Sequence, residues 1–125
     1  MKNLKLGKKK IYGQELILDL FDCDPKIIRS KKKILEYSNQ LCDLIKVKKH
    51  GKPIIRRFGF KKAFITGYSL AQLIESSLVS GHFSELWNRA FVNVFSCKSF
   101  NIKKVKGFTK KFFKAKKIKS RTLIR

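Results

Sequence analysis

The sequence predicts an α+β fold, a two-layer sandwich in which helices cover one face of an antiparallel sheet. Two observations lead to it. Segments whose apolar residues recur at every second position lie near the start, before Cys97 and at the end, and segments with helical spacing separate them. The other face of such a sheet would need cover, so we expect a homodimer or higher homo-oligomer that stacks two sheets into a four-layer αββα arrangement.

The first third of the chain predicts one strand and one helix. Residues 15–21, ELILDLF, alternate strictly and indicate a strand. Asp24 followed by Pro25 is a favourable start for a helix, which the apolar spacing extends over residues 25–46. His50 and Gly51 close this segment.

The rest of the chain predicts further strands and a second helix. Short apolar runs suggest extended pieces within 53–60 and 63–68, whereas 70–76 fits either a helix or a strand. Residues 89–97, RAFVNVFSC, predict a strand, 105–114 predict a helix, and the last nine residues alternate again. Between these elements, IESSLVSGHFSE at 74–85 has the composition of a polar turn.

Length and composition limit the class of protein. A chain of 125 residues with 43% hydrophobic residues suits a single domain, 1–125. No apolar run is long enough to span a membrane, and the basic start lacks the apolar stretch of a signal peptide. Three cysteines without a CxxC pair argue against a disulfide framework or a metal site and favour a cytoplasmic location.

Several side chains suited to covalent chemistry lie in or near the segment 74–85. They are Ser69, the pair Ser76-Ser77, His82 and, at the end of the following strand, Cys97. Nucleophilic catalysis needs a hydroxyl or thiol beside a base, and histidine is the base poised near neutral pH. From composition alone, however, a serine-rich segment containing glycine is more often only a turn.

The joint spacing resembles that of the bacterial and archaeal S-adenosylmethionine decarboxylases. Counted from Ser77, Ser69 lies eight residues before, His82 five after and Cys97 twenty after. Further matching pieces are Tyr12-Gly13, Gly67, the run AFVNVFSC and FKAK at 113–116. The resemblance extends over roughly residues 11–119.

The resemblance implies a self-processing enzyme with a pyruvoyl cofactor. Ser77 would attack the carbonyl of Ser76, the chain would separate into 1–76 and 77–125, and Ser77 would become the pyruvoyl group. Ser69 and His82 correspond to the family's processing residues, with His82 as the processing base. The pyruvoyl group would form a Schiff base with the substrate amine, and Cys97 would be the proton donor after loss of CO₂. The resemblance would also place this reaction in spermidine and polyamine biosynthesis.

Departures from the family pattern concern the cleavage site and the substrate. Ser76 stands where the family usually has glutamate, and Glu75 lies one residue earlier, so a cut between Glu75 and Ser76 is the second possibility. Asn93 replaces a common aspartate. Ornithine or arginine is therefore an alternative substrate to S-adenosylmethionine. Candidate substrate-binding residues are Phe64, Phe83 and Glu85.

Two other functions compete with the decarboxylase. The formal net charge is +23, and eleven of residues 103–125 are Lys or Arg with phenylalanines among them, a composition that could bind nucleic acid through non-specific charge. Because the basic residues also cover the first helix evenly, a solvated surface is the simpler interpretation. A Ser-His hydrolase ranks last, since the chain has no GxSxG motif.

Overall fold

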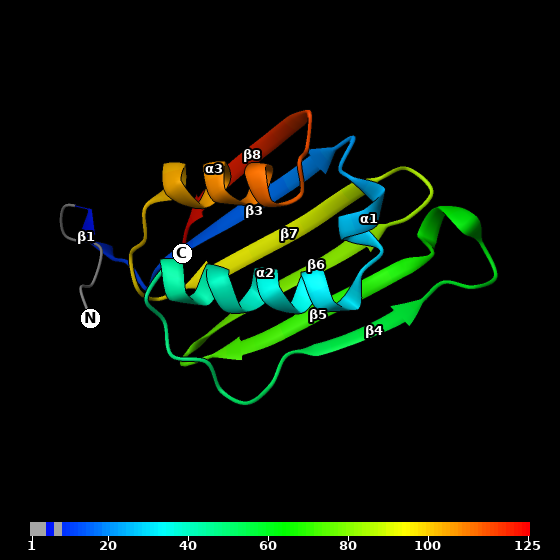
Figure 1. Ribbon diagram of the computed structural model, residues 1–125. Coiled ribbons are helices and arrows are strands. Elements are labelled where there is room, and N and C mark those ends of the chain that lie inside the picture. Colours follow the sequence, from blue (N-terminus) through cyan, green and yellow to red (C-terminus); the bar gives the residue numbers. More distant parts are fainter. Residues whose placement is uncertain (1–4, 7–8) are drawn as a thin grey trace.

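A six-stranded antiparallel sheet forms one layer of the molecule, and the helices form the other (Figure 1). The computed structural model describes residues 5–6 and 9–125. The strands of the sheet lie in the order β4-β5-β6-β7-β3-β8. Their bounds are β3 (Gln14–Phe21), β4 (Ile54–Phe58), β5 (Gly67–Ile74), β6 (Ser77–Ser84), β7 (Arg89–Ser96) and β8 (Lys117–Ile124). A separate two-stranded ribbon consists of β1 (Lys5–Leu6) and β2 (Lys9–Lys10). The predicted α+β class is confirmed.

The helices α2 (Lys31–Leu44) and α3 (Ile102–Phe112) lie side by side on one face of the sheet (Figure 1). Tyr37 of α2 is fully buried where the layers meet. Its ring stacks on Phe108 at 5.6 Å between centroids, and its hydroxyl lies 2.8 Å from the Thr109 hydroxyl of α3. This bond satisfies a polar group that burial would otherwise leave unpaired. No helix in the described part of the chain is long and apolar enough to cross a membrane.

The single helix predicted over 25–46 is wrong, because two helices occupy the segment. The short α1 (Pro25–Ile28) begins at Asp24, whose carboxylate accepts a hydrogen bond from the Lys26 amide at 2.9 Å. The chain then leaves the helical conformation at Ser30, whose hydroxyl accepts from the Lys33 amide at 3.1 Å and caps α2. A serine that caps a helix has extended backbone angles, so the helix is interrupted at this residue although the spacing of the apolar residues continues across it.

The polar turn predicted over 74–85 is also wrong, since nearly all of this segment is strand. β5 and β6 form a hairpin whose turn is only Glu75 and Ser76. Val79 and Phe83 of β6 are fully buried against the helices, while Ser80 and His82 lie on the outer face. The two-residue period was hidden by Gly81, which supplies no apolar side chain on the inner face, and by Leu78, which is apolar but lies on the outer face.

The other differences are local. Residues 63–65, expected to be extended, form the short helix η1 (Ala63–Ile65), and the ambiguous stretch 70–76 lies mainly in β5. The second helix begins at Ile102, earlier than predicted, because the Asn101 side chain caps it by accepting from the Lys104 amide at 3.0 Å. The strands predicted over 15–21, 89–97 and the last nine residues are confirmed.

Candidate active site

The tip of the β5–β6 hairpin carries a strained backbone. Ser76 has a φ of 63°, a left-handed conformation that costs a side-chain-bearing residue free energy. Its carbonyl oxygen accepts a hydrogen bond from the Tyr12 hydroxyl at 3.1 Å. The peptide bond between Ser76 and Ser77 therefore follows a strained residue, and its carbonyl already faces a proton donor.

Ser77, the first residue of β6, lies beside Cys97. The Ser77 hydroxyl oxygen accepts a hydrogen bond from the Cys97 amide at 3.0 Å. The antiparallel register brings them together: Leu78 pairs with Phe95, so Ser77 lies next to the end of β7. Two residues twenty positions apart in the sequence thus share one site, and the Cys97 side chain is buried.

The hairpin tip opens onto two surface pockets. One, of about 570 Å³, is lined by both serines and by Lys48, Lys49 and His50, among others. The other, of about 220 Å³, is lined by Glu75, Cys97 and neighbouring residues. The larger volume lies within the range of about 300–1,000 Å³ that small-molecule sites occupy. A chain end created at Ser77 would open into this space, so the surroundings fit a pyruvoyl group at that position.

Ser69 and His82 form a hydrogen-bonded pair on the outer face of the sheet. They are register partners in β5 and β6, and the Ser69 hydroxyl lies 2.9 Å from Nδ1 of His82. Nε2 of His82 lies 3.0 Å from the Ile65 carbonyl oxygen, which can only accept, so Nε2 carries a proton. In the neutral ring Nδ1 is then free to accept the serine proton, as a general base must.

The structure does not bring this pair to the hairpin tip. Ser77 and His82 lie five residues apart along one extended strand, which corresponds to about 16 Å. The candidate site is therefore in two halves on one chain. The first contains Ser76, Ser77 and Cys97, and the second contains Ser69 and His82.

The candidate substrate-binding residues lie at the end of the sheet near His82. Phe64 is partly exposed, with its ring 5.7 Å from that of Trp87. Phe83 is fully buried and packs on Phe113 at 5.3 Å between centroids, so it belongs to the core and cannot face a ligand.

Glu85, the third candidate, is held by an arginine. It accepts two hydrogen bonds of 2.8 Å from the Arg57 guanidinium. This bond to the charged form lowers the pKa of the Glu85 carboxyl below its usual range. Glu85 is therefore ionised and already paired.

Sequence reasoning missed two parts of the hairpin tip. Tyr12 was noticed only as part of a matching Tyr-Gly step, and its contact with Ser76 spans 64 positions that no local pattern connects. Lys48 and Lys49 follow the helix predicted over 25–46, and no element was predicted for them. They instead lie along β5, where Lys49 pairs with Ile74 and the Glu75 amide donates to the Lys48 carbonyl at 2.9 Å. The segment VKKHG carries no strand signal that could have indicated this.

Comparison with known proteins assigns the chain to a class and then to a family. Residues 14–125 match a family of decarboxylases, in agreement with the fold and with the candidate serine, histidine and cysteine residues. The protein is an enzyme of that class. The chain belongs to the S-adenosylmethionine decarboxylase family.

A solved structure supports the fold. The adenosylmethionine decarboxylase from Aquifex aeolicus VF5 is similar to this chain with a TM-score of 0.78 at 19% identity, over 94% of this chain and 92% of that one. No match was found among curated proteins. The resemblance inferred from the spacing around Ser77 is thus confirmed at the level of the family and its fold.

Proposed function

We propose that this protein is a pyruvoyl-dependent S-adenosylmethionine decarboxylase of polyamine biosynthesis that produces its own cofactor by cleavage between Ser76 and Ser77. The observation that carries the proposal is the family match over residues 14–125, which includes this junction. Buried free thiols at Cys23 and Cys42 suit a reducing cytoplasm, where we place the enzyme.

The local geometry supports Ser76-Ser77 as the junction instead of Glu75-Ser76. The Ser77 hydroxyl is held by the Cys97 amide, and the Ser76 carbonyl is held by Tyr12. Both the attacking oxygen and the attacked group are thus oriented. The left-handed conformation of Ser76 costs of order 1 kcal/mol, and cutting the chain would release it.

A second copy of the chain would complete the site. Self-cleavage needs a base, and the Ser69–His82 pair is about 16 Å from Ser77 on the same strand. Two sheets could stack through their outer faces about a twofold axis that runs across the strands near Ser80. The hairpin tip of each copy would then lie over the Ser69–His82 pair of the other, as an isologous contact requires.

The outer face has the side chains for such a contact. At the hairpin end, Leu73, Leu78 and Phe95 form one row across three strands, with Leu73 56% and Leu78 38% exposed. Phe91 lies beside His82 in the row at the other end. Covering these apolar groups would be favourable at about 25 cal/mol per Å².

Within the completed site, each half would have a distinct task. A pyruvoyl carbonyl at position 77 would supply the electron-withdrawing group that stabilises the carbanion left by CO₂. The Cys97 thiol, which lines the smaller pocket beside Ser77, would return a proton to the substrate α-carbon. The His82 imidazole of the second copy would take the proton of the Ser77 hydroxyl and later its α-proton during processing.

Intact mass of the purified protein tests the proposal. The wild type should give two fragments, 1–76 and 77–125, the second without a free amino terminus, and it should release CO₂ from S-adenosylmethionine. Ser77→Ala should remain one chain. Cys97→Ala keeps the amide that contacts Ser77, so it should still be cleaved but lose most CO₂ release. A wild-type chain that stays whole and inactive would overturn the proposed function.

A further inference from the structure

We propose that Tyr12 is a catalytic residue of the self-cleavage, where its hydroxyl stabilises the negative charge that develops on the Ser76 carbonyl oxygen. This inference rests on the proposed function, because it assigns a role in the same cleavage. The observation that carries it is the 3.1 Å hydrogen bond from the Tyr12 hydroxyl to that oxygen.

Tyr12 is held by a contact of its ring and by hydrogen bonds of its backbone. It stacks on Phe95, with 5.9 Å between centroids and an angle of 19° between the planes. Its backbone amide donates to the Arg125 carbonyl at 2.7 Å, and Gly13 exchanges two further bonds with Arg125, of 3.1 and 2.9 Å. The end of β8 thus anchors the backbone while Phe95 orients the ring. A donor held in advance costs little reorganisation during a reaction.

Each bond change in the first step is accounted for. The Ser77 oxygen forms a bond to the Ser76 carbonyl carbon, its proton passes to a base, and the carbonyl electrons move to the oxygen that Tyr12 contacts. When this oxygen re-forms its double bond, the carbon–nitrogen bond to Ser77 breaks and the nitrogen takes up a proton. The product is an ester and a free amine, with no change in oxidation state. A donor aimed at the charged oxygen stabilises the tetrahedral state more than the neutral amide.

The position of Tyr12 also limits the size of the effect. The side chain is 54% exposed, so water could replace part of its contribution. Loss of one donor from an enclosed oxyanion hole costs about 10²–10³-fold in rate, and a donor open to solvent should contribute less. We expect about a tenfold to hundredfold slowing of cleavage when the hydroxyl is removed.

The test follows the appearance of the two fragments after cell-free synthesis of the full chain. Tyr12→Phe keeps the ring on Phe95 and removes only the donor, so cleavage should slow while the final fragments are unchanged. Tyr68→Phe, which removes a hydroxyl far along β5, should be cleaved at the wild-type rate. If wild type is cleaved and Tyr12→Phe keeps pace with it, the role of Tyr12 is refuted and the proposed function stands. If wild type is not cleaved, the proposed function itself fails.

A graded substitution separates chemistry from structure. Fluorinated tyrosines placed at position 12 have the same shape but a more acidic phenol. Measured at a pH where each phenol keeps its proton, cleavage should become faster as the acidity rises. A rate that does not change along this series, even with a slow Tyr12→Phe, would mean that the hydroxyl only supports the fold.

Discussion

Ser76 combines a strained backbone with a long-range contact at its carbonyl. Its backbone is left-handed with a φ of 63°, and its carbonyl accepts a bond from a side chain 64 positions away. Glycine would be the ordinary choice for this conformation, since it has no Cβ to clash. A serine at this position keeps strain at the peptide bond that we expect to break.

Replacing Ser76 by glycine should therefore stabilise the uncleaved chain. In a Ser77→Ala background, which prevents cleavage, Ser76→Gly should raise the free energy of unfolding by about 1 kcal/mol, because the left-handed conformation no longer costs energy. Urea denaturation measures this. Ser80→Gly, in the middle of β6, should instead lower it by about 0.5–1 kcal/mol. Equal destabilisation by both changes would contradict the strain at Ser76.

Two cysteines outside the site should be chemically inert in the folded protein. Burial, with the nearby Asp22 carboxylate, raises the pKa of the Cys23 thiol to about 12, and burial raises that of Cys42 to about 11. Only the thiolate is nucleophilic, so neither should react with an aromatic disulfide reagent at pH 8 until the protein unfolds. Mass analysis of the labelled peptides locates the reacted thiols. Rapid labelling of Cys23 or Cys42 under native conditions would contradict these pKa values.

At the scale of elements, capping residues determine the helix starts that the apolar spacing did not predict. Ser30 starts α2 and Asn101 starts α3, each by accepting a bond from an amide three residues later. Apolar spacing continues across the gap between α1 and α2, so periodicity alone predicted one helix. A side-chain cap is a single residue and leaves little trace in such a pattern.

Removal of the Ser30 cap should destabilise the fold measurably. Ser30→Ala leaves the Lys33 amide without its partner, and such changes typically cost about 1 kcal/mol. Thermal or urea unfolding of the Ser77→Ala chain gives the value. Lys32→Ala, in the same first turn but without a capping bond, is the matched control and should have little effect. A similar loss of stability in both variants would contradict a specific contribution of the Ser30 cap.

The sequence predicted the half of the sheet formed by β7, β3 and β8 better than the β5–β6 hairpin. Strict alternation predicted β3, β7 and β8, since one face of each packs on the core. β6 was not predicted because apolar Leu78 on its outer face and Gly81 on its inner face interrupt the alternation. For the site, the spacing of Ser77 and Cys97 along the chain identified both as candidate site residues. It could not predict that Ser69 and His82 lie at the far end of the same strands, because that depends on register.

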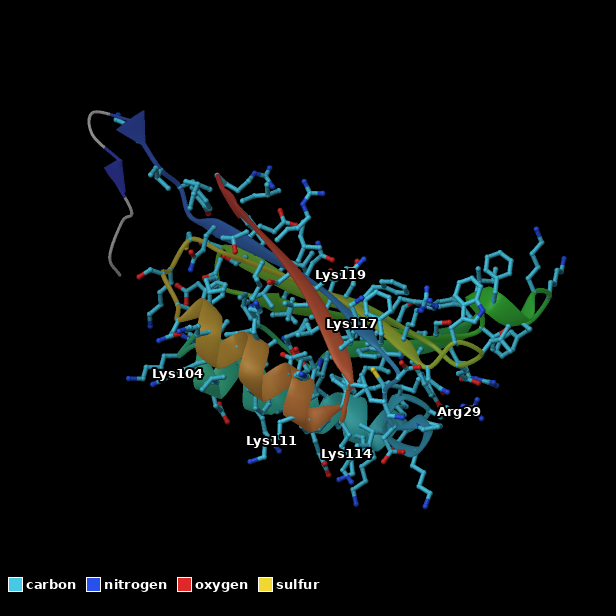
Figure 2. All side chains as sticks on the ribbon, turned by 90° about the horizontal axis from the view of Figure 1, so that it is seen from above. Arg29, Lys104, Lys111, Lys114, Lys117 and Lys119 are labelled. Carbon is cyan, nitrogen blue, oxygen red and sulfur yellow. The ribbon has the colours of Figure 1, made fainter. Side chains whose placement is uncertain are left out.

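At the scale of the whole molecule, the positive charge is spread over both faces. Figure 2 shows Lys104 and Lys111 on α3, Lys114 just beyond its end, and Lys117 and Lys119 on β8. The amines of the last two lie 5.8 and 5.7 Å from the Phe21 ring. The cations do not form a single stripe, which argues against a nucleic-acid groove. On the outer face, the Arg125 guanidinium lies 5.5 Å from the centroid of the Phe95 ring, at one end of the row of Leu73, Leu78 and Phe95.

Mixing two inactive variants tests the two-copy site. Ser77→Ala lacks the residue to be cut, and His82→Ala lacks the base, so each should stay whole alone. When the two are produced together, the His82→Ala chain should be cleaved, because the intact Ser69–His82 pair of its partner reaches its hairpin. Intact mass identifies which chain was cut. Production of His82→Ala together with the double variant Ser77→Ala/His82→Ala is the control, and the His82→Ala chain must then remain whole. No cleavage in the mixture would contradict the shared site.

The order of strands determines what a cut at the hairpin would do to the chain. Residues 1–76 contribute β3, β4 and β5, and residues 77–125 contribute β6, β7 and β8. In the sheet, β3 lies between β7 and β8, so a strand of the first piece is enclosed by strands of the second. The pieces should stay together in native chromatography but, once denatured, would have to meet again in solution. Recovery would then depend on protein concentration, so cleavage would turn a reversible single-chain folding reaction into an assembly reaction that dilution prevents.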